Sequence, residues 1–139
     1  MSVDSTGMAA RLGIKPGMVV QELGWDEDAD EDLRDAVVDL SGGEMVDEST
    51  DEVADVVLMW WREDDGDLVD ALMDAIGSLA DDGVVWLLVP KSGRPGHVEP
   101  GDVTEAAPTA GLSQTSSISA AKDWSGIRLV TPKAARSRR

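Results

Sequence analysis

Apolar runs separated by turn residues predict a chain of alternating strands and helices. Residues 84–89 (VVWLLV) are apolar throughout, a pattern typical of a central strand that is covered on both faces in a parallel sheet. Residues 112–120 and 127–130 are joined by a short connection, so they are expected to form an antiparallel hairpin. The full set of predicted strands is 18–23, 44–48, 53–61, 84–89, 112–120 and 127–130.

Three helices are predicted between these strands. Residues 26–40 begin with acidic side chains, and their apolar residues from Leu33 to Leu40 recur with the spacing of one helix face. Residues 66–79 repeat this spacing, and residues 102–110 are expected to form a shorter helix. The alternation indicates an α/β fold: a Rossmann-like, mostly parallel sheet with a C-terminal antiparallel hairpin, arranged as a three-layer sandwich.

A single domain is expected, because 139 residues match the common size of one domain. We expect this domain to cover 13–130 and to follow a flexible lead-in at 1–12. Residues 131–139 contain Lys and Arg but no acidic residue, so they are expected to form a basic, disordered tail.

The formal net charge of −16 narrows the classes of partner. An acidic surface repels phosphate backbones and anionic lipid head groups, so neither nucleic acid nor a membrane is an expected partner. Basic proteins or cations suit this charge better. No apolar run approaches the roughly 18 residues of a membrane span, and residues 1–10 lack the basic and apolar regions of a signal peptide. We therefore expect a cytoplasmic protein.

Motifs for catalysis are scarce. The chain has no Cys, and it contains no nucleophile elbow, Walker loop, HExxH motif or zinc-ligand spacing. His97 is the only His and the one obvious general base, but a loop His without an evident partner is more often incidental. The acidic run 26–32 is interpreted as the solvated start of a helix and the run 63–67 as a capped loop, with loose cation binding as the alternative for both. We expect no catalytic residue, no cofactor and no metal.

The order of elements resembles a shortened class I methyltransferase. The resemblance rests on residues 12–20, 79–85 and 110–112, which lead into the first strand, the central strand and the hairpin. Such enzymes typically follow the first strand with a glycine-rich turn against the cofactor. Here residues 22–27 (ELGWDE) supply one Gly followed by Trp and acids. The resemblance therefore implies the fold with a degenerate cofactor turn. For the acid that holds a ribose in such enzymes, Asp47 or Glu48 is the nearest candidate.

The chain is also similar to a family of small, acidic actinobacterial proteins of unknown function. The similarity covers chiefly the C-terminal half of the chain. It rests on residues 90–100 (PKSGRPGHVEP), 105–112 (EAAPTAGL) and 122–124 (KDW). This resemblance implies no activity and no catalytic residues.

Candidate binding residues gather at the predicted carboxyl ends of the parallel strands, where open α/β sheets bind ligands. Lys91 and Arg94 could bind an anionic group or an acidic peptide, with Trp25 or Trp61 as a stacking platform. Alternatively, Pro and Gly merely shape a long connection whose cations pair with nearby carboxylates. Of the adjacent Trp60 and Trp61, one is expected in the core and the other at the surface. The candidate residues are Trp25, Trp61, Arg62, Lys91, Ser92, Arg94 and His97.

Two functions follow from this edge. The first is a non-catalytic binding or regulatory protein that recognises a protein partner. The second is a binder of a small anionic ligand, either a nucleotide or an S-adenosyl compound, with residual catalysis. Both rest on the same combination: a methyltransferase-like scaffold, a first strand without its glycine-rich turn, and cations in the loop 90–100.

Overall fold

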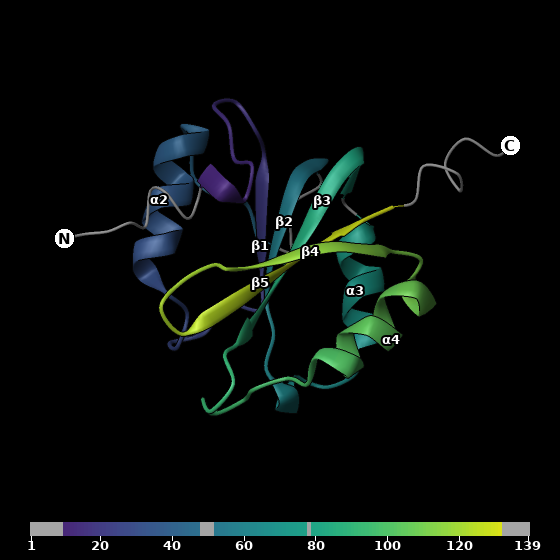
Figure 1. Cartoon of the computed structure of the whole chain (residues 1–139). Helices are drawn as coiled ribbons and strands as arrows, with labels where there is room; N and C mark the ends of the chain where they lie inside the picture. Colours follow the sequence, from purple (N-terminus) through teal and green to yellow (C-terminus); the bar gives the residue numbers. More distant parts are fainter. Residues whose placement is uncertain (1–9, 48–51, 78, 132–139) are drawn as a thin grey trace, which may run out of the picture.

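The computed structural model describes residues 10–47, 52–77 and 79–131, and it contains one five-stranded sheet (Figure 1). The strands lie in the order β1-β2-β3-β5-β4. The first three are parallel, β5 runs antiparallel to β3, and β4 runs antiparallel to β5. The elements are β1 (Val20–Leu23), α2 (Glu31–Ser41), β2 (Ala54–Trp60), η1 (Glu63–Asp65), α3 (Leu68–Ile76), β3 (Leu79–Pro90), α4 (Pro100–Ala110), β4 (Ser113–Ser119) and β5 (Trp124–Val130).

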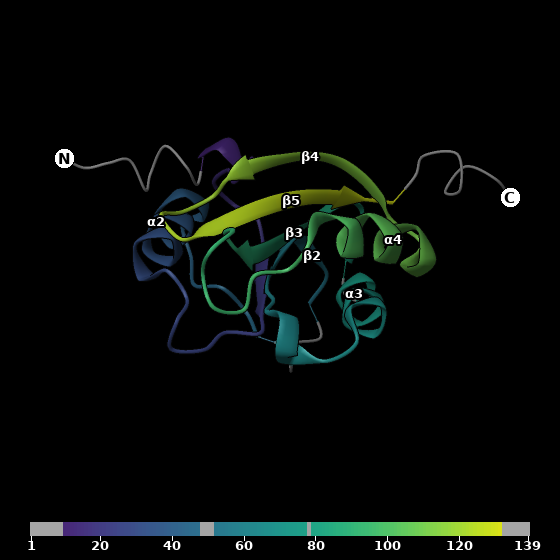
Figure 2. The same cartoon turned by 60° about the horizontal axis from the view of Figure 1, so that its bottom comes forward.

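Helices cover both faces of the sheet, which confirms the predicted three-layer sandwich. Helix α2 lies on one side of the central strands, and α3 and α4 lie on the other (Figure 2). Adjacent residues of a strand face opposite sides, so β2 contributes Trp60 to the cluster under α2 and Met59 to the cluster under α3 and α4. The two clusters form the core of the protein.

Helix α2 begins later than its acidic sequence predicts. The Asp30 side chain accepts a hydrogen bond from the Leu33 N–H at 2.9 Å, so it caps a helix that starts at Glu31 and not at residue 26. The helix ends at Gly42, whose φ of 86° is favourable for glycine. Residues 26–30 therefore remain a loop beyond the carboxyl end of β1.

Strand β3 is longer than predicted, because the expected turn at residues 81–83 lies inside it. Ala54 of β2 pairs with Leu79, whereas Val56 pairs with Val84, so β3 carries an irregular insertion at this point. The Leu79 side chain lies directly over Gly83, where an added Cβ would be 2.6 Å from Leu79 Cδ1. Pairing on both sides of the insertion keeps the strand continuous.

The hairpin is confirmed, but β5 begins at Trp124 and not at residue 127. Gly126 pairs with Leu88 inside the sheet. A Cβ at this position would lie only 3.2 Å from Trp86 Cε3, so glycine allows the Trp86 ring to pack closely here. Of the strand predicted at 44–48, the described residues 44–47 show only a parallel bridge between Val46 and Gln21, and residue 48 lies outside the described residues.

The N-terminal segment joins the core earlier than expected. Leu12 is 3% exposed, and its carbonyl accepts a hydrogen bond from Trp86 Nε1 at 2.8 Å. Most of the predicted tail, residues 132–139, lies outside the described residues. None of the helices in the described part of the chain has the length and apolarity that crossing a membrane requires.

Packing of α3 gives a test of the fold with a control on the same helix. Leu72 of α3 is fully buried, whereas the neighbouring Met73 on the same helix is 54% exposed. Leu72→Ala is expected to lower the free energy of unfolding by about 2–5 kcal/mol, because it leaves a cavity. Met73→Ala should change it by no more than about 0.5 kcal/mol. Urea denaturation measures both values, and equal losses in the two variants would contradict the packing of α3.

Candidate functional site

A cleft of about 630 Å³ opens at the carboxyl ends of β1 and β2. Its walls come from the residues that follow these two strands, from the segment after Val46 and from α3. This is the edge at which open α/β sheets bind ligands. The cleft is lined by Glu22, Leu23, Gly24, Trp25, Asp26, Asp47, Met59, Trp60, Trp61, Arg62, Asp65, Ala71 and Asp74.

A buried carboxylate, Glu22, forms the back of this cleft. Glu22 is 8% exposed, and Arg34 of α2 binds both of its oxygens, at 2.6 Å through Nε and 2.8 Å through Nη2. The Trp60 indole N–H donates a third hydrogen bond to Glu22 at 2.9 Å. Hydrogen bonds to Glu22 and Glu31 raise the pKa of Arg34 despite partial burial. This charge-assisted network fixes α2 against β1 and β2.

Trp25 is exposed at the mouth of the cleft but is held in place. Its side chain is 49% exposed, and its indole N–H donates to Glu31 at 3.2 Å. The Arg34 guanidinium lies 5.6 Å from the ring centroid, a cation–π distance. Hydrogen bonds from Arg34 and then Trp25 lower the pKa of Glu31. Trp25 thus presents a fixed aromatic surface to solvent.

Arg62 fills the space between the ends of β1 and β2. Its Nη1 donates to the Gly24 carbonyl at 2.7 Å, and its guanidinium also binds the carboxylates of Asp28 and Asp65. It lies 5.3 Å from the centroid of the Trp124 ring. Burial acts to lower the pKa of Arg62, but the hydrogen bonds to the two carboxylates outweigh it and the pKa is raised.

The loop after β1 is closed against the sheet at both ends. Gly24 has a φ of +75°, and a Cβ there would lie 2.3 Å from the Trp60 carbonyl oxygen. Further along the loop, the Asp28 carbonyl accepts a hydrogen bond from Trp124 Nε1 at 3.2 Å. The single glycine therefore serves the close approach of β1 to β2.

Both adjacent tryptophans are buried, so the expectation that one of them is exposed is wrong. They do face opposite sides of the sheet. Trp60 contacts Trp124 edge-to-face, with ring centroids 4.8 Å apart, and Trp61 packs in the cluster under α3 and α4. Trp61 lines the cleft but is only 8% exposed, so it offers no open stacking face.

The cations of loop 90–100 do not line the cleft with Trp25. Lys91 Nζ donates to Ser119 Oγ at 2.6 Å, and Arg94 pairs with Asp123 at 3.2 Å. Ser119 is the last residue of β4, and Asp123 lies in the connection between β4 and β5. Ser92 is exposed in the turn between the two cations. The sequence predicted that Lys91 and Arg94 share one site with Trp25. In the structure, the Ser119 hydroxyl and the Asp123 carboxylate hold these two cations away from that cleft.

His97 holds its own loop in place. Its Nδ1 lies 3.0 Å from the Pro90 carbonyl oxygen, so Nδ1 carries the proton and donates. Its Nε2 lies 4.0 Å from a Glu99 oxygen. Among the described residues, no group of three or more His, Cys, Asp or Glu is arranged to hold a metal ion.

Sequence reasoning missed Glu22, Arg34 and Asp28, which it treated as part of a strand and a solvated acidic helix. A signal was present for Arg34, because it is the only Lys or Arg between Lys15 and Arg62. A lone cation in such an acidic segment is a strong candidate for a buried ion pair.

The chain belongs to a family of proteins of unknown function, DUF3052, which matches residues 9–133. An uncharacterised protein of Mycobacterium tuberculosis H37Rv, Rv2239c, is 56% identical over 135 residues, which cover 97% of this chain and 85% of that protein. An uncharacterised protein of Mycobacterium bovis, Mb2263c, matches to the same extent. The predicted membership of a family of unknown function is confirmed.

Solved structures of methyltransferases share the fold. A SAM-dependent methyltransferase from Aquifex aeolicus has a TM-score of 0.63 at 14% identity, over 91% of this chain and 88% of that chain. The O-methyltransferase NcsB1 from neocarzinostatin biosynthesis has a TM-score of 0.66 at 15% identity, over 93% of this chain and 54% of that chain. The predicted methyltransferase-like fold is therefore confirmed, and identity this low shows the fold alone.

The close approach at Gly24 predicts an unusually costly substitution. Gly17 has a similar φ of +88° but nothing within 4 Å of an added Cβ, so Gly17→Ala should cost only about 1–2 kcal/mol for the left-handed backbone. Gly24→Ala adds a clash with backbone, which raises the cost by a further 1–3 kcal/mol or so. Equal free energies of unfolding for the two variants would contradict the closed loop.

The pair of Asp28 with Arg62 predicts a dependence of stability on pH. The hydrogen bond from Arg62 lowers the pKa of Asp28 from 3.8, so the ionised form stabilises the folded protein above that pH. This contribution is lost as pH falls through the lower, folded pKa. The stability difference between wild type and Asp28→Asn should therefore be present near neutrality and shrink in acid. Asp39→Asn, on the exposed side of α2, is the control; urea titrations that give a pH-independent gap for Asp28→Asn would refute the assignment.

Proposed function

We propose that this protein is a non-catalytic binding protein that uses its methyltransferase-like scaffold to recognise a basic segment of a partner protein. The observation that carries the proposal is the position of Arg62. Its guanidinium, bound to Gly24, Asp28 and Asp65, occupies the space between the ends of β1 and β2. In open α/β sheets, bound ligands lie beyond these strand ends.

The charge of the cleft supports a cationic partner. Its lining includes five acidic residues and one cation, Arg62, and the Asp65 and Glu22 carboxylates are already paired with arginines. Asp26 and Asp74 also line the cleft, and neither forms an ion pair with a described residue. Lys or Arg side chains of a partner would complement them, and such pairing speeds association and selects against acidic partners.

Trp25 supports a protein as the partner. A large aromatic side chain that is fixed, half-exposed and next to carboxylates is the kind of residue that dominates protein interfaces. Arg34 already lies over one region of the ring at 5.6 Å, which shows that the ring accepts a guanidinium at this position. A partner Arg could extend the same stack from the solvent side.

The alternative function is the binding of an S-adenosyl compound in the same cleft. Asp47 supports it, because it lines the cleft directly after Val46, which bridges to β1. The NcsB1 methyltransferase has been solved in complex with S-adenosyl-L-homocysteine. A nucleotide fits less well, since its phosphates would meet the carboxylates of the cleft.

Affinity capture from a native lysate with quantitative mass spectrometry tests the proposal. Asp26→Asn with Asp74→Asn removes two cleft charges, and Asp35→Asn with Asp39→Asn removes two charges from exposed positions of α2. Wild type and the α2 variant should capture the same basic proteins. The cleft variant should capture about tenfold less of each, because each lost ion pair weakens binding. Trp25→Ala should lose the same proteins.

Two outcomes would contradict the proposal. Identical retained proteins for all baits, or no specific protein for wild type, would exclude the cleft as a protein-binding surface. In parallel, calorimetry with S-adenosylmethionine and S-adenosyl-L-homocysteine tests the alternative. Stoichiometric binding that Asp47→Asn abolishes would establish the alternative in its place.

A further inference from the structure

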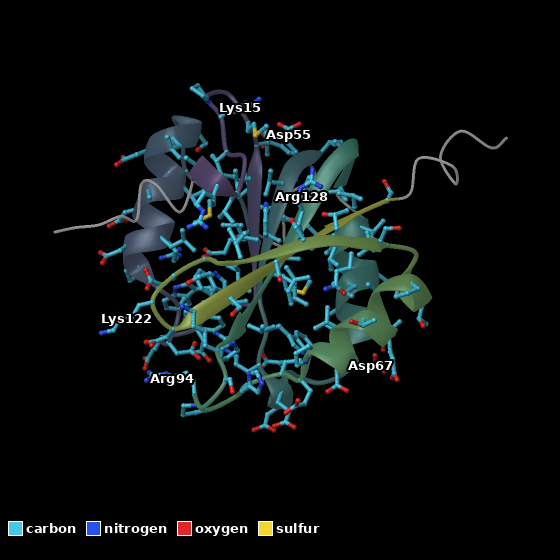
Figure 3. The ribbon with its side chains drawn as sticks, viewed as in Figure 1. Lys15, Asp55, Asp67, Arg94, Lys122 and Arg128 are labelled. Atoms are coloured by element: carbon cyan, nitrogen blue, oxygen red, sulfur yellow. The ribbon has the colours of Figure 1, made fainter. Side chains whose placement is uncertain are left out.

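A second cleft lies at the opposite edge of the sheet, at the amino ends of the parallel strands. Its volume is about 450 Å³, within the usual range for small-molecule sites. The N-terminal segment forms one wall, and the first residues of β2 with the facing parts of β3 and β5 form the others. Lys15, Asp55 and Arg128, which line it, lie at the upper end of the molecule in Figure 3.

The floor of this cleft is apolar. Leu12 is 3% exposed, and Val56 and Trp86 are each 2% exposed. The Trp86 indole N–H donates to the Leu12 carbonyl at 2.8 Å, so the ring has no donor left for a ligand. Met18 and Val84 add partly buried apolar surface. This floor suits a hydrocarbon or aromatic group.

The rim of the cleft is cationic in a chain of net charge −16. Arg11, Lys15 and Arg128 line it, and none of them forms an ion pair with a carboxylate in the part of the chain that the structure describes. Arg128 is the direct cross-strand neighbour of Trp86, and its Nη1 lies 3.1 Å from Thr115 Oγ1. Each of these cations thus remains available for an anion.

Among the side chains that the structure describes, Asp55 is the one carboxylate that lines the cleft, and it has a structural role. Its Oδ2 accepts a hydrogen bond from the Val19 N–H at 2.9 Å, which joins the start of β2 to the segment before β1. Three cations and one carboxylate therefore give the described lining of the cleft a positive charge. In a protein of the opposite net charge, such a site attracts anions that the rest of the surface repels.

We propose that this cleft binds a small organic anion: a single carboxylate, sulfonate or phosphate group attached to an apolar body. The anionic group lies between Lys15 and Arg128 at the rim, and the apolar body packs on Met18 and Val84, the partly buried apolar residues of the lining. The site is separate from the acidic cleft, because the two lie at opposite ends of the parallel strands. It therefore stands whether or not the proposed protein partner exists.

Anilinonaphthalene sulfonate is a suitable probe, because it combines one sulfonate with an aromatic body and fluoresces in apolar sites. Wild type is expected to bind one equivalent. Naphthoate should displace the probe, whereas naphthalenemethanol, which has the same apolar body without the charge, should not displace it at the same concentration. Displacement by both compounds alike, or no saturable binding, would overturn the proposal.

Three pairs of variants locate the site, and in each pair the charge change is the same. Lys15→Gln and Arg128→Gln remove cations at the cleft, whereas Lys122→Gln and Arg94→Gln remove cations at the lower left of Figure 3. Asp55→Asn removes the carboxylate of the cleft but keeps an oxygen for the Val19 N–H. Its control, Asp67→Asn, keeps an oxygen for capping α3.

The two kinds of cleft variant should act in opposite directions. Lys15→Gln and Arg128→Gln are expected to weaken probe binding about threefold each, and Asp55→Asn is expected to strengthen it by a similar factor. The three control variants should leave the affinity unchanged. Equal changes of probe affinity in the cleft variants and their controls would show that binding responds to net charge alone. That result would overturn the proposed site. Lys15 is exposed, so Lys15→Gln is expected to fold normally. It still tests the site if Arg128→Gln is unstable.

Discussion

The guanidinium of Arg62 is the interaction on which the carboxyl edge of this sheet depends. It joins the Gly24 carbonyl at the end of β1 to Asp28 in the following loop and to Asp65 in η1, and it lies against the Trp124 ring at the start of β5. Three segments far apart in the sequence, 24–28, 62–65 and the start of β5, therefore meet at this side chain. Such a charge is stable only while its partners surround it, which makes the loop, η1 and the hairpin mutually dependent.

A second arginine, Arg34, holds the buried Glu22 that lines the same cleft. Arg34 binds the buried Glu22 through two hydrogen bonds and Glu31 through a third, and the Trp60 indole satisfies Glu22 further. With 28 acidic residues and 12 Lys and Arg, the chain can pair only a minority of its carboxylates. The pairs at Glu22 and Asp28 hold the ends of β1 and β2 and the start of α2 in register. The unpaired acids are left for the surface.

The sequence predicted the elements, the three layers and the family resemblance, because these follow from periodicity and turn residues. It did not predict that residues 81–83 continue a strand, since only pairing on both sides and Leu79 packed over Gly83 make that possible. The site was harder still. Lys91 and Arg94 follow a strand end, as a binding site would require, but their direction is set by Ser119 and Asp123, about 30 positions later in the chain.

Charge is distributed differently at the two edges of the sheet. In this architecture, helix N-termini point toward the carboxyl edge of the sheet and favour negative charge there. Here carboxylates occupy these positions: Asp30 caps α2 with Glu31 and Asp32 in its first turn, and Asp67 caps α3. The helix dipoles are thereby neutralised by the chain itself. With Arg62 also paired internally, the excess charge at this edge is negative, whereas unpaired cations remain at the amino ends of the strands.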